Sequence, residues 1–310
     1  MCALFGWLDY SGKIPHKILT KLTQSLANAA EERGTDASGI SYIRDSKVVI
    51  YKRPKPAHKL RFRVPVGTTA VMGHTRLTTQ GNQKFNYNNH PFYGYARKGF
   101  SFAHNGVLYN DAELKKSKNL PNTHIKTDSY VAVQLIEKQG KLDFESLKSM
   151  AENVCGSFTF TLLDENNMLY FIKGSSPLYL IHFKKLGLYV YASTQTIMEK
   201  ALKSCGLYHY AYSVIAVKSG DILSINCLGS MAHDKFQDSA LDWFEYPFHT
   251  SRWDEDDTQL DTILEICNCF GAEPDTIWEL LDYGYSYDEI EAFLMEPSAL
   301  QEDLHLIGEI

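Results

Sequence analysis

The apolar residues of the chain follow the periods of strands and of helices, and the two kinds of segment come in blocks. Residues 2–10 are a nearly continuous apolar run, which predicts a buried strand. Residues 18–32 carry apolar residues three and four positions apart, which predicts an amphipathic helix. The helix is expected to stop at Arg33 and Gly34, and a strand ending near residue 43 then pairs with residues 47–54 as a hairpin.

Further along, the pattern predicts two strands that end in polar sequence. The first contains Val71 and Met72 and is expected to leave the sheet from Gly73 onward, into a loop rich in Thr, Gln, Gly and Asn. The second, over residues 100–110, is expected to break at His104-Asn105-Gly106, because Asn-Gly is a common hairpin turn. A helix capped by Asp128 and another over residues 144–153 follow.

Residues 157–226 contain the main group of predicted strands. Five apolar or alternating segments span residues 157–165, 167–174, 177–183, 188–194 and 214–226, with one helix near residues 198–203. Strands and helices in blocks, joined by hairpin-like connections, favour an α+β layered sandwich over a doubly wound parallel sheet.

The last part of the chain has a different pattern and a different charge. Residues 253–310 contain seventeen Asp and Glu and no Lys or Arg, so all 31 basic residues lie in the first 252, against 20 acidic ones. We expect a body over residues 2–232, an aromatic and acidic linker over 233–258, a small acidic three-helix module over 259–297 and a tail over 298–310. Such an acidic block serves as an interaction segment or is simply a solvated face.

Composition excludes several classes of protein. No apolar run reaches the length of a membrane span, and the N-terminus lacks the order of a signal peptide, so a cytoplasmic protein without a membrane partner is expected. The six cysteines show no CxxC spacing, which argues against a metal site, and no cofactor is expected. The basic residues of the body are spread out, so no nucleic-acid partner is expected either.

The candidate chemistry begins at Cys2, directly behind the initiator methionine. Removal of Met1 would give one residue both a thiol and a free α-amine. Because an α-amine titrates near about 8, it can accept the thiol proton, and the residue is a nucleophile with its own base. The alternative is that Met-Cys occurs here by chance.

Three other positions supply polar groups that suit a small amino-acid substrate. Arg76 at a strand end can bind a carboxylate through two parallel hydrogen bonds, although most such arginines are surface charges. The amide of Asn105 and the backbone N–H of Gly106 can form an oxyanion hole instead of a hairpin turn. Asp128 is either a helix cap or an acceptor for an ammonium group.

Seven ordered blocks resemble the class II glutamine amidotransferases, the N-terminal nucleophile glutaminases found at the front of glucosamine-phosphate synthase and amidophosphoribosyltransferase. After the N-terminal Cys strand, the blocks are ERGTDASG, GHTRLTTQGN, NNHPF, AHNGVLYN, TDSYVAVQLI and CGSFTFTLLD, which together cover residues 2 to about 230. The resemblance implies an α+β fold of the N-terminal nucleophile hydrolase type, a four-layer αββα sandwich.

The resemblance also assigns roles to residues. It makes Cys2 the nucleophile, Asn105 and Gly106 the oxyanion hole, Arg76 the carboxylate-binding residue and Asp128 the acceptor of the α-ammonium group. It further places Leu77 and Thr79 in the loop that binds substrate, and Arg33, Asp36 and His74 in blocks that support the site. Several family members carry an aromatic residue at the position of Leu77, and one branch carries His at that of Gln80.

The predicted function is hydrolysis of L-glutamine to glutamate and ammonia through a thioester on Cys2. The ammonia acceptor is expected to be absent from this chain, so that the ammonia passes to a separate synthase subunit or simply to water. Two alternatives remain: a catalytically idle binding protein on the same fold that acts through its acidic C-terminal tail, and an amidase acting on another amide. The pairing of Arg76 with Asp128 favours an amino-acid head group and therefore glutamine.

Overall fold

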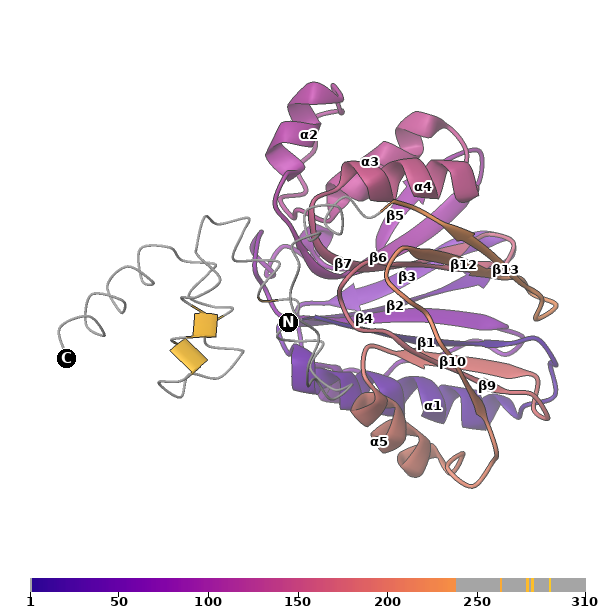
Figure 1. The fold of residues 1–310 in the computed structure, drawn as a ribbon. Helices are drawn as coiled ribbons and strands as arrows, with labels where there is room; N and C mark the ends of the chain where they lie inside the picture. Colours follow the sequence, from indigo (N-terminus) through magenta and orange to yellow (C-terminus); the bar gives the residue numbers. More distant parts are fainter. Residues whose placement is uncertain (1, 238–262, 264–276, 279, 282–289, 291–310) are drawn as a thin grey trace. The chain divides into compact units, whose positions relative to one another are not determined.

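The structure is a computed structural model that describes residues 2–237 and the isolated positions 263, 277, 278, 280, 281 and 290. The chain divides into two compact units, Met1–Ser239 and Ala240–Ile310. The first unit holds the fold described below, and its elements are labelled in Figure 1.

A seven-stranded antiparallel sheet, here called sheet A, contains the N-terminal strand near its centre. Its order is β11-β9-β10-β1-β4-β2-β3. The strands are β1 (Ala3–Asp9), β2 (Ala37–Arg44), β3 (Lys47–Arg53), β4 (Ala70–Arg76), β9 (Tyr179–Phe183), β10 (Leu188–Ala192) and β11 (Ser213–Ile215).

A second antiparallel sheet of six strands, sheet B, has the order β13-β12-β8-β7-β6-β5. The strands are β5 (Phe92–Tyr95), β6 (Gly99–Leu108), β7 (Gly156–Asp164), β8 (Leu169–Lys173), β12 (Asp221–Ile225) and β13 (Met231–Lys235).

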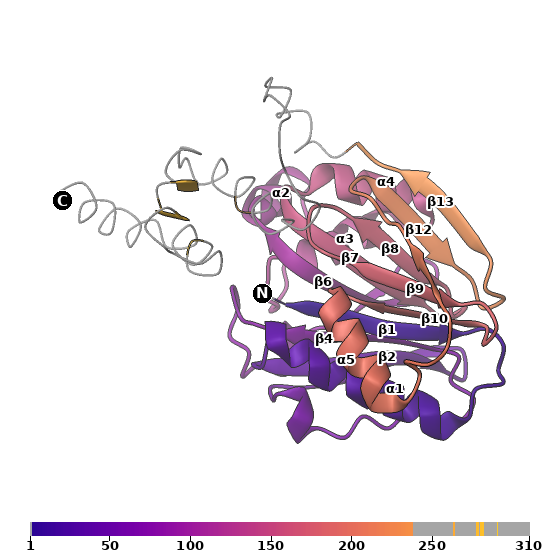
Figure 2. The same ribbon diagram turned by 60° about the horizontal axis from the view of Figure 1, so that its bottom comes forward.

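Helices cover the outer face of each sheet. These are α1 (His16–Ala29) and α5 (Gln195–Cys205) on sheet A and α3 (Tyr130–Gln139) and α4 (Phe144–Asn153) on sheet B, beside the short α2 (Asp111–Ser117) and the 3-10 turns η1 (Ala30–Arg33), η2 (Ala57–Lys59) and η3 (Asn86–Asn88). One hydrophobic cluster lies under each helix pair and a third lies between the sheets. The four layers are visible in Figure 1, and Figure 2, turned by 60°, shows α1 and α5 lying across sheet A. The predicted four-layer αββα sandwich is therefore confirmed for the described residues.

The central position of β1 follows from its sequence. All seven of its residues are buried, because one face packs under α1 and α5 and the other against sheet B. The indole N–H of Trp7 is satisfied by the hydroxyl of Thr23 on α1, at 2.8 Å. A strand that is apolar on both faces is stable only in the interior of the fold. The position of β1 in turn places Cys2, the residue directly before it, relative to both sheets.

Several predicted elements are confirmed. Strands β2 and β3 form the predicted hairpin. Helix α4 has the predicted bounds and begins with a capping box between Asp143 and Ser146. Helix α5 contains the helix predicted near residues 198–203, and α1 begins two residues before the predicted start.

Two predictions about strand ends are wrong. Strand β4 does not end at Gly73 but continues to Arg76, paired with β1 and β2. Strand β6 does not break at His104-Asn105-Gly106 but pairs with β7 through all three residues. The sequence pattern failed because these polar side chains face a buried site rather than solvent.

The predictions for the C-terminal region mostly fall outside the described residues. Strand β13 crosses the boundary expected after residue 232. The rest of the predicted linker, most of the three-helix module at 259–297 and the tail at 298–310 lie outside the residues that the structure describes. Of the module, Ile263, Ile277, Leu280 and Ile290 are described and buried. None of the described helices is long and apolar enough to cross a membrane.

Candidate active site

Cys2 lies directly before β1, at the end of sheet A where the first residue of β1 and the last residue of β4 lie side by side. The two strands are antiparallel, with Ala3 opposite Thr75, so the next pair outward is Cys2 and Arg76. The backbone of Cys2 is fixed from the other side, because Arg33 Nε donates to its carbonyl oxygen at 2.9 Å. Sheet pairing thus brings the candidate nucleophile and the candidate carboxylate-binding residue to one place.

The Cys2 thiol lies in an enclosed environment, although the residue as a whole is partly exposed. Its hydrogen bond within the described part of the chain goes to the carbonyl oxygen of Leu77, at 3.4 Å. Burial raises the pKa of the thiol; Asp128 also raises it, whereas the positive charge of Arg76 lowers it. The thiol is therefore protonated at neutral pH and needs a base before it can act as a nucleophile.

Arg76 is buried, with 3 % of its surface exposed. Its guanidinium donates to Asn89 Oδ1 at 2.7 Å, to the carbonyl oxygen of Gly81 at 2.9 Å and to that of Gln80. All three acceptors are neutral. The cation thus has no carboxylate hydrogen-bonded to it among the described residues, and a carboxylate ligand would complete its charge balance.

The loop after β4 is held at its start by Asp36. Thr78 N donates to the Asp36 carboxylate at 2.8 Å, and Asp36 N donates to the Arg76 carbonyl at 2.9 Å. Leu77, which lies between these two anchors, is 43 % exposed, and Thr79, directly after them, is also exposed. The two residues predicted to bind substrate are therefore free to contact a ligand, and Asp36 holds the start of their loop.

Asn105 and Gly106 lie inside strand β6 rather than in a turn. Asn105 is 1 % exposed, and its side-chain Nδ2 has no hydrogen-bond partner. Gly106 has φ +133°, and a Cβ there would lie 2.0 Å from the carbonyl oxygen of Ser157. Only glycine fits this backbone, and a buried amide donor without an acceptor needs an explanation beyond the fold.

Asp128 is buried but is not the helix cap that the sequence also suggested. The N-cap of α3 is Ser129, and no side-chain cap bond is present. Instead, Asp128 Oδ2 accepts from the backbone N–H of Leu108 at 2.7 Å, and Oδ1 accepts from Ser129 Oγ at 3.3 Å. Asp128 is thus attached to the end of β6, a short distance along the strand from Asn105.

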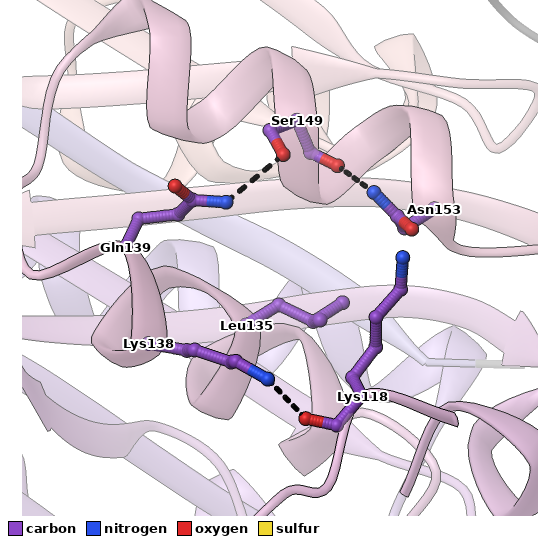
Figure 3. A pocket seen from close by; sticks show the side chains of 6 residues that line it. All are labelled: Lys118, Leu135, Lys138, Gln139, Ser149 and Asn153. Atoms are coloured by element: carbon purple, nitrogen blue, oxygen red, sulfur yellow. Dashed lines mark hydrogen bonds between the residues drawn. The ribbon is translucent and has the colours of Figure 1, made fainter. Parts of the chain in front are cut away.

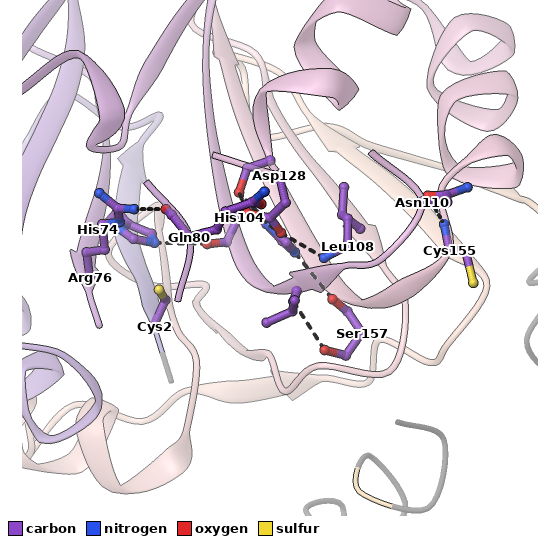
Figure 4. A network of polar contacts seen from close by, with 12 residues as sticks. Cys2, His74, Arg76, Gln80, His104, Leu108, Asn110, Asp128, Cys155 and Ser157 are labelled. Atoms are coloured by element: carbon purple, nitrogen blue, oxygen red, sulfur yellow. Dashed lines mark hydrogen bonds and ion pairs between the residues drawn. The ribbon is translucent and has the colours of Figure 1, made fainter. Parts of the chain in front are cut away.

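Three buried histidines surround these groups without adding charge. His74 Nε2 contacts the His104 carbonyl at 2.9 Å, and His104 Nδ1 contacts Ser129 Oγ at 2.8 Å. Burial lowers the pKa of His74 to about 3 and also lowers the pKa values of His104 and His90. They are neutral at physiological pH and act as hydrogen-bonding supports. Figure 4 shows Cys2, His74, Arg76, His104 and Asp128 in this network.

Sequence reasoning missed two residues that shape the site, Asn89 and Lys52. Asn89 is fully buried and links Arg76 to the Gln83 carbonyl, which its Nδ2 contacts at 2.8 Å. The sequence signal for Asn89 is the NNHPF block, to whose residues the resemblance assigns no role. In the sequence, Lys52 is one polar residue in the second strand of a predicted hairpin, and nothing there indicates a role.

A separate cavity of about 210 Å³ lies at the outer helices and contains none of the candidate site residues. Its lining comes from Lys118, Leu135, Lys138, Gln139, Ser149 and Asn153 (Figure 3). Within the described residues, no group of three or more His, Cys, Asp or Glu side chains could hold a metal ion.

Comparison with protein families gives a match in the middle of the chain. Residues 74–200 match the family described as "Glutamine amidotransferase domain". The glutamine–fructose-6-phosphate aminotransferase of Bacillus cereus is 35 % identical over 186 residues, which cover 57 % of this chain and 30 % of that protein. The 7-cyano-7-deazaguanine synthase 2 of Sulfurisphaera tokodaii is 27 % identical over 227 residues, which cover 70 % of this chain and 48 % of that protein.

Solved structures show the same fold. The glutamine phosphoribosylpyrophosphate amidotransferase of B. subtilis superposes with a TM-score of 0.60 at 18 % identity, over 88 % of this chain and 59 % of that one. The chain spans about three tenths of the aminotransferase's length and about half of the synthase's.

Proposed function

Because the chain contains a glutamine amidotransferase domain of the class II, N-terminal nucleophile type, we propose that it hydrolyses L-glutamine to glutamate and ammonia. The observation that carries the proposal is the pairing of β1 with β4, which brings Cys2 beside the buried Arg76, while the charges of Arg76 and the buried Asp128 both influence the pKa of the Cys2 thiol. A cation, an anion and a nucleophile at these relative places suit a zwitterionic amino acid that carries a reactive amide.

In the proposed reaction, the Cys2 sulfur attacks the side-chain amide carbon of glutamine. The thiol is protonated at rest, and the histidines of the site are neutral and make no hydrogen bond to it among the described residues. We assign the proton transfer to the α-amine that Cys2 would carry after removal of Met1. The amine passes the proton to the leaving nitrogen, the C–N bond breaks and ammonia departs. Water then cleaves the thioester and releases glutamate.

The other candidate residues take the roles that their surroundings favour. Arg76 binds the substrate α-carboxylate, and Asp128 receives the α-ammonium group. The unpartnered Nδ2 of Asn105, with the N–H of Gly106, donates to the oxyanion of the tetrahedral intermediate. Leu77 and Thr79 contact the substrate from the exposed loop.

We propose a separate synthase as the acceptor of the ammonia. The relatives compared above are named as an aminotransferase, a synthase and an amidotransferase, and each is longer than the stretch it shares with this chain. Those names are all names of enzymes, so they give no support to the alternative of an idle binding protein. The pathway is defined by the partner that consumes the ammonia.

The proposal is tested by intact mass spectrometry before and after incubation with a glutamine-mimicking diazoketone, with glutamate production assayed in parallel. A chain that lacks Met1, gains one adduct on Cys2 and releases glutamate from glutamine is the expected result. A chain that retains Met1, or that neither reacts nor turns over glutamine, would contradict the proposal.

Arg76→Lys is expected to raise the Michaelis constant for glutamine about tenfold with a smaller change in kcat. A lysine keeps the charge but loses the two parallel hydrogen bonds to a carboxylate. It also cannot reach Asn89, Gln80 and Gly81 together, so the substrate loop loosens. Steady-state kinetics measure both constants, and an unchanged Michaelis constant would count against the assigned role. Arg53→Lys on the exposed end of β3 is the matched control.

A further inference from the structure

Lys52 lies behind the candidate carboxylate-binding residue, on strand β3 at the edge of sheet A. Its Nζ donates to the carbonyl oxygens of Asn89 and Pro91, at 2.9 Å for Pro91, and lies 5.0 Å from the centre of the Phe92 ring. Its hydrogen bonds within the described residues reach two carbonyl oxygens and no carboxylate. Even a half-buried ammonium held in this way loses part of its hydration, and this cost indicates a function for its charge.

The segment that Lys52 holds is the one that orients Arg76. The backbone carbonyl of Asn89 accepts a hydrogen bond from Lys52, and its side-chain Oδ1 accepts one from Arg76 at 2.7 Å. The segment also packs closely on the sheet, because a Cβ on Gly39, the β2 partner of Lys52, would lie 2.6 Å from the His90 carbonyl oxygen. Lys52, Asn89 and Arg76 are therefore connected by a continuous series of hydrogen bonds.

The titratable groups around Lys52 are predominantly positively charged or neutral. Strand β4 contributes Arg76 and the neutral His74, the segment before β5 contributes the neutral His90, and β6 contributes the neutral His104. Burial and the charge of Arg76 lower the pKa of Lys52 to about 7. Lys52 in turn lowers the pKa values of His74 and His90. The anionic groups of the site, Asp36 and Asp128, act on Arg76.

We propose that Lys52 is a positioning residue for substrate binding, which holds the Asn89 segment against Arg76 and adds a second positive charge behind the carboxylate that Arg76 binds. The inference rests on the glutaminase function proposed above and extends it. It predicts that glutamine binding and the protonation of Lys52 favour each other.

The direction of the pH effect follows from this coupling. A bound carboxylate stabilises the ammonium form of Lys52 and raises its pKa from about 7 in the free protein. By reciprocity, protonated Lys52 strengthens glutamine binding by the same factor, which is about tenfold for each pKa unit. Binding is therefore tight below pH 7 and weakens as the pH rises through the pKa values of the free and the bound states.

The experiment is calorimetric titration of glutamine into the full chain carrying Cys2→Ala, which prevents turnover, at pH 6.0 and pH 8.5. In this background we expect Lys52→Met to weaken binding about tenfold at pH 6.0. Lys52→Arg, whose charge is not lost in this range, should restore tight binding and remove the weakening at pH 8.5 that the lysine protein shows. Lys47→Met, on the exposed start of the same strand, is the matched control and should keep the parent's pH dependence.

Thermal unfolding of each variant separates a folding defect from a binding defect. Titration of the parent near pH 7.5, in buffers of different ionisation enthalpy, should show proton uptake that Lys52→Arg lacks. Parallel pH profiles for the parent and Lys52→Arg, or unweakened binding by Lys52→Met at pH 6.0, would overturn this inference alone. Absence of glutamine binding in every variant, the parent included, would overturn the proposed function together with it.

Discussion

Cys2→Ala is expected to abolish glutamine hydrolysis, with a loss on the order of a thousandfold or more, and to leave the fold intact. The thiol is the group that forms the thioester, and the neutral histidines nearby offer no substitute nucleophile. The structural cost is small, because the hydrogen bond that the sulfur makes among the described residues, to the Leu77 carbonyl at 3.4 Å, has a weak thiol donor. A change of less than about 1 kcal/mol in the free energy of unfolding is expected. Glutamate release and thermal unfolding of the purified variant measure the two effects.

Cys227→Ala provides the matched control. Cys227 is also a free cysteine, exposed just after β12. Its replacement should leave both glutamate release and the single diazoketone adduct unchanged. Turnover that persists in Cys2→Ala, or an adduct that disappears in Cys227→Ala, would show that the nucleophile has been placed on the wrong residue.

The layers of the fold could be predicted because hydrophobic periodicity reports which faces of an element are buried. The three-to-four spacing of Leu19, Leu22 and Leu26 marks the face of α1 that packs on sheet A. The same reasoning failed for α2 and β5. Helix α2 has seven residues, three of them Lys or Glu on its exposed side, and β5 follows Pro91 and contains Gly94. Short elements with few buried residues leave too weak a pattern to be recognised.

The site was predictable only where a residue type itself implies chemistry. Cys2, Arg76, Asn105 and Asp128 were identified from their side chains and from the resemblance, and the structure gathers them by pairing β1 with β4 and by tying Asp128 to the end of β6. The roles of Asn89 and Lys52 depend on contacts with residues far away in the sequence. Nothing local shows that a lysine of an edge strand will reach the carbonyls of a loop almost forty residues later.

The error at β6 has a physical cause that bears on catalysis. Asn-Gly predicts a turn because both residues tolerate positive φ, and Gly106 does adopt φ +133°. The chain uses this freedom within a paired strand, where the carbonyl oxygen of Ser157 leaves no room for a Cβ. The strand stays in register while Nδ2 of Asn105 is left buried and without a hydrogen-bond partner. The feature that misled the prediction of structure is therefore the one that supports the prediction of an oxyanion hole.

Asn105→Ala is accordingly expected to lower kcat for glutamine about a hundredfold, with little change in thermal stability. Loss of one oxyanion donor typically costs about 3 kcal/mol of transition-state stabilisation. The folded protein gives up no partner for Nδ2, so the melting temperature should fall by less than about 4 °C. Steady-state kinetics and thermal unfolding measure the two quantities on the same preparation.

Asn110→Ala is the control, because it should lower thermal stability and leave kcat unchanged, the opposite of what is expected for Asn105→Ala. The Asn110 side chain donates to the Asn153 carbonyl and accepts from Cys155 N, both at 2.9 Å, and so joins the start of α2 to the end of α4 and the start of β7. Its replacement removes both hydrogen bonds and should lower the melting temperature, whereas kcat should stay near that of the wild type. If instead Asn105→Ala kept kcat within about fivefold of the wild type, its unpaired amide would have no part in stabilising the oxyanion, and the donors would have to be sought among backbone N–H groups such as that of Gly106.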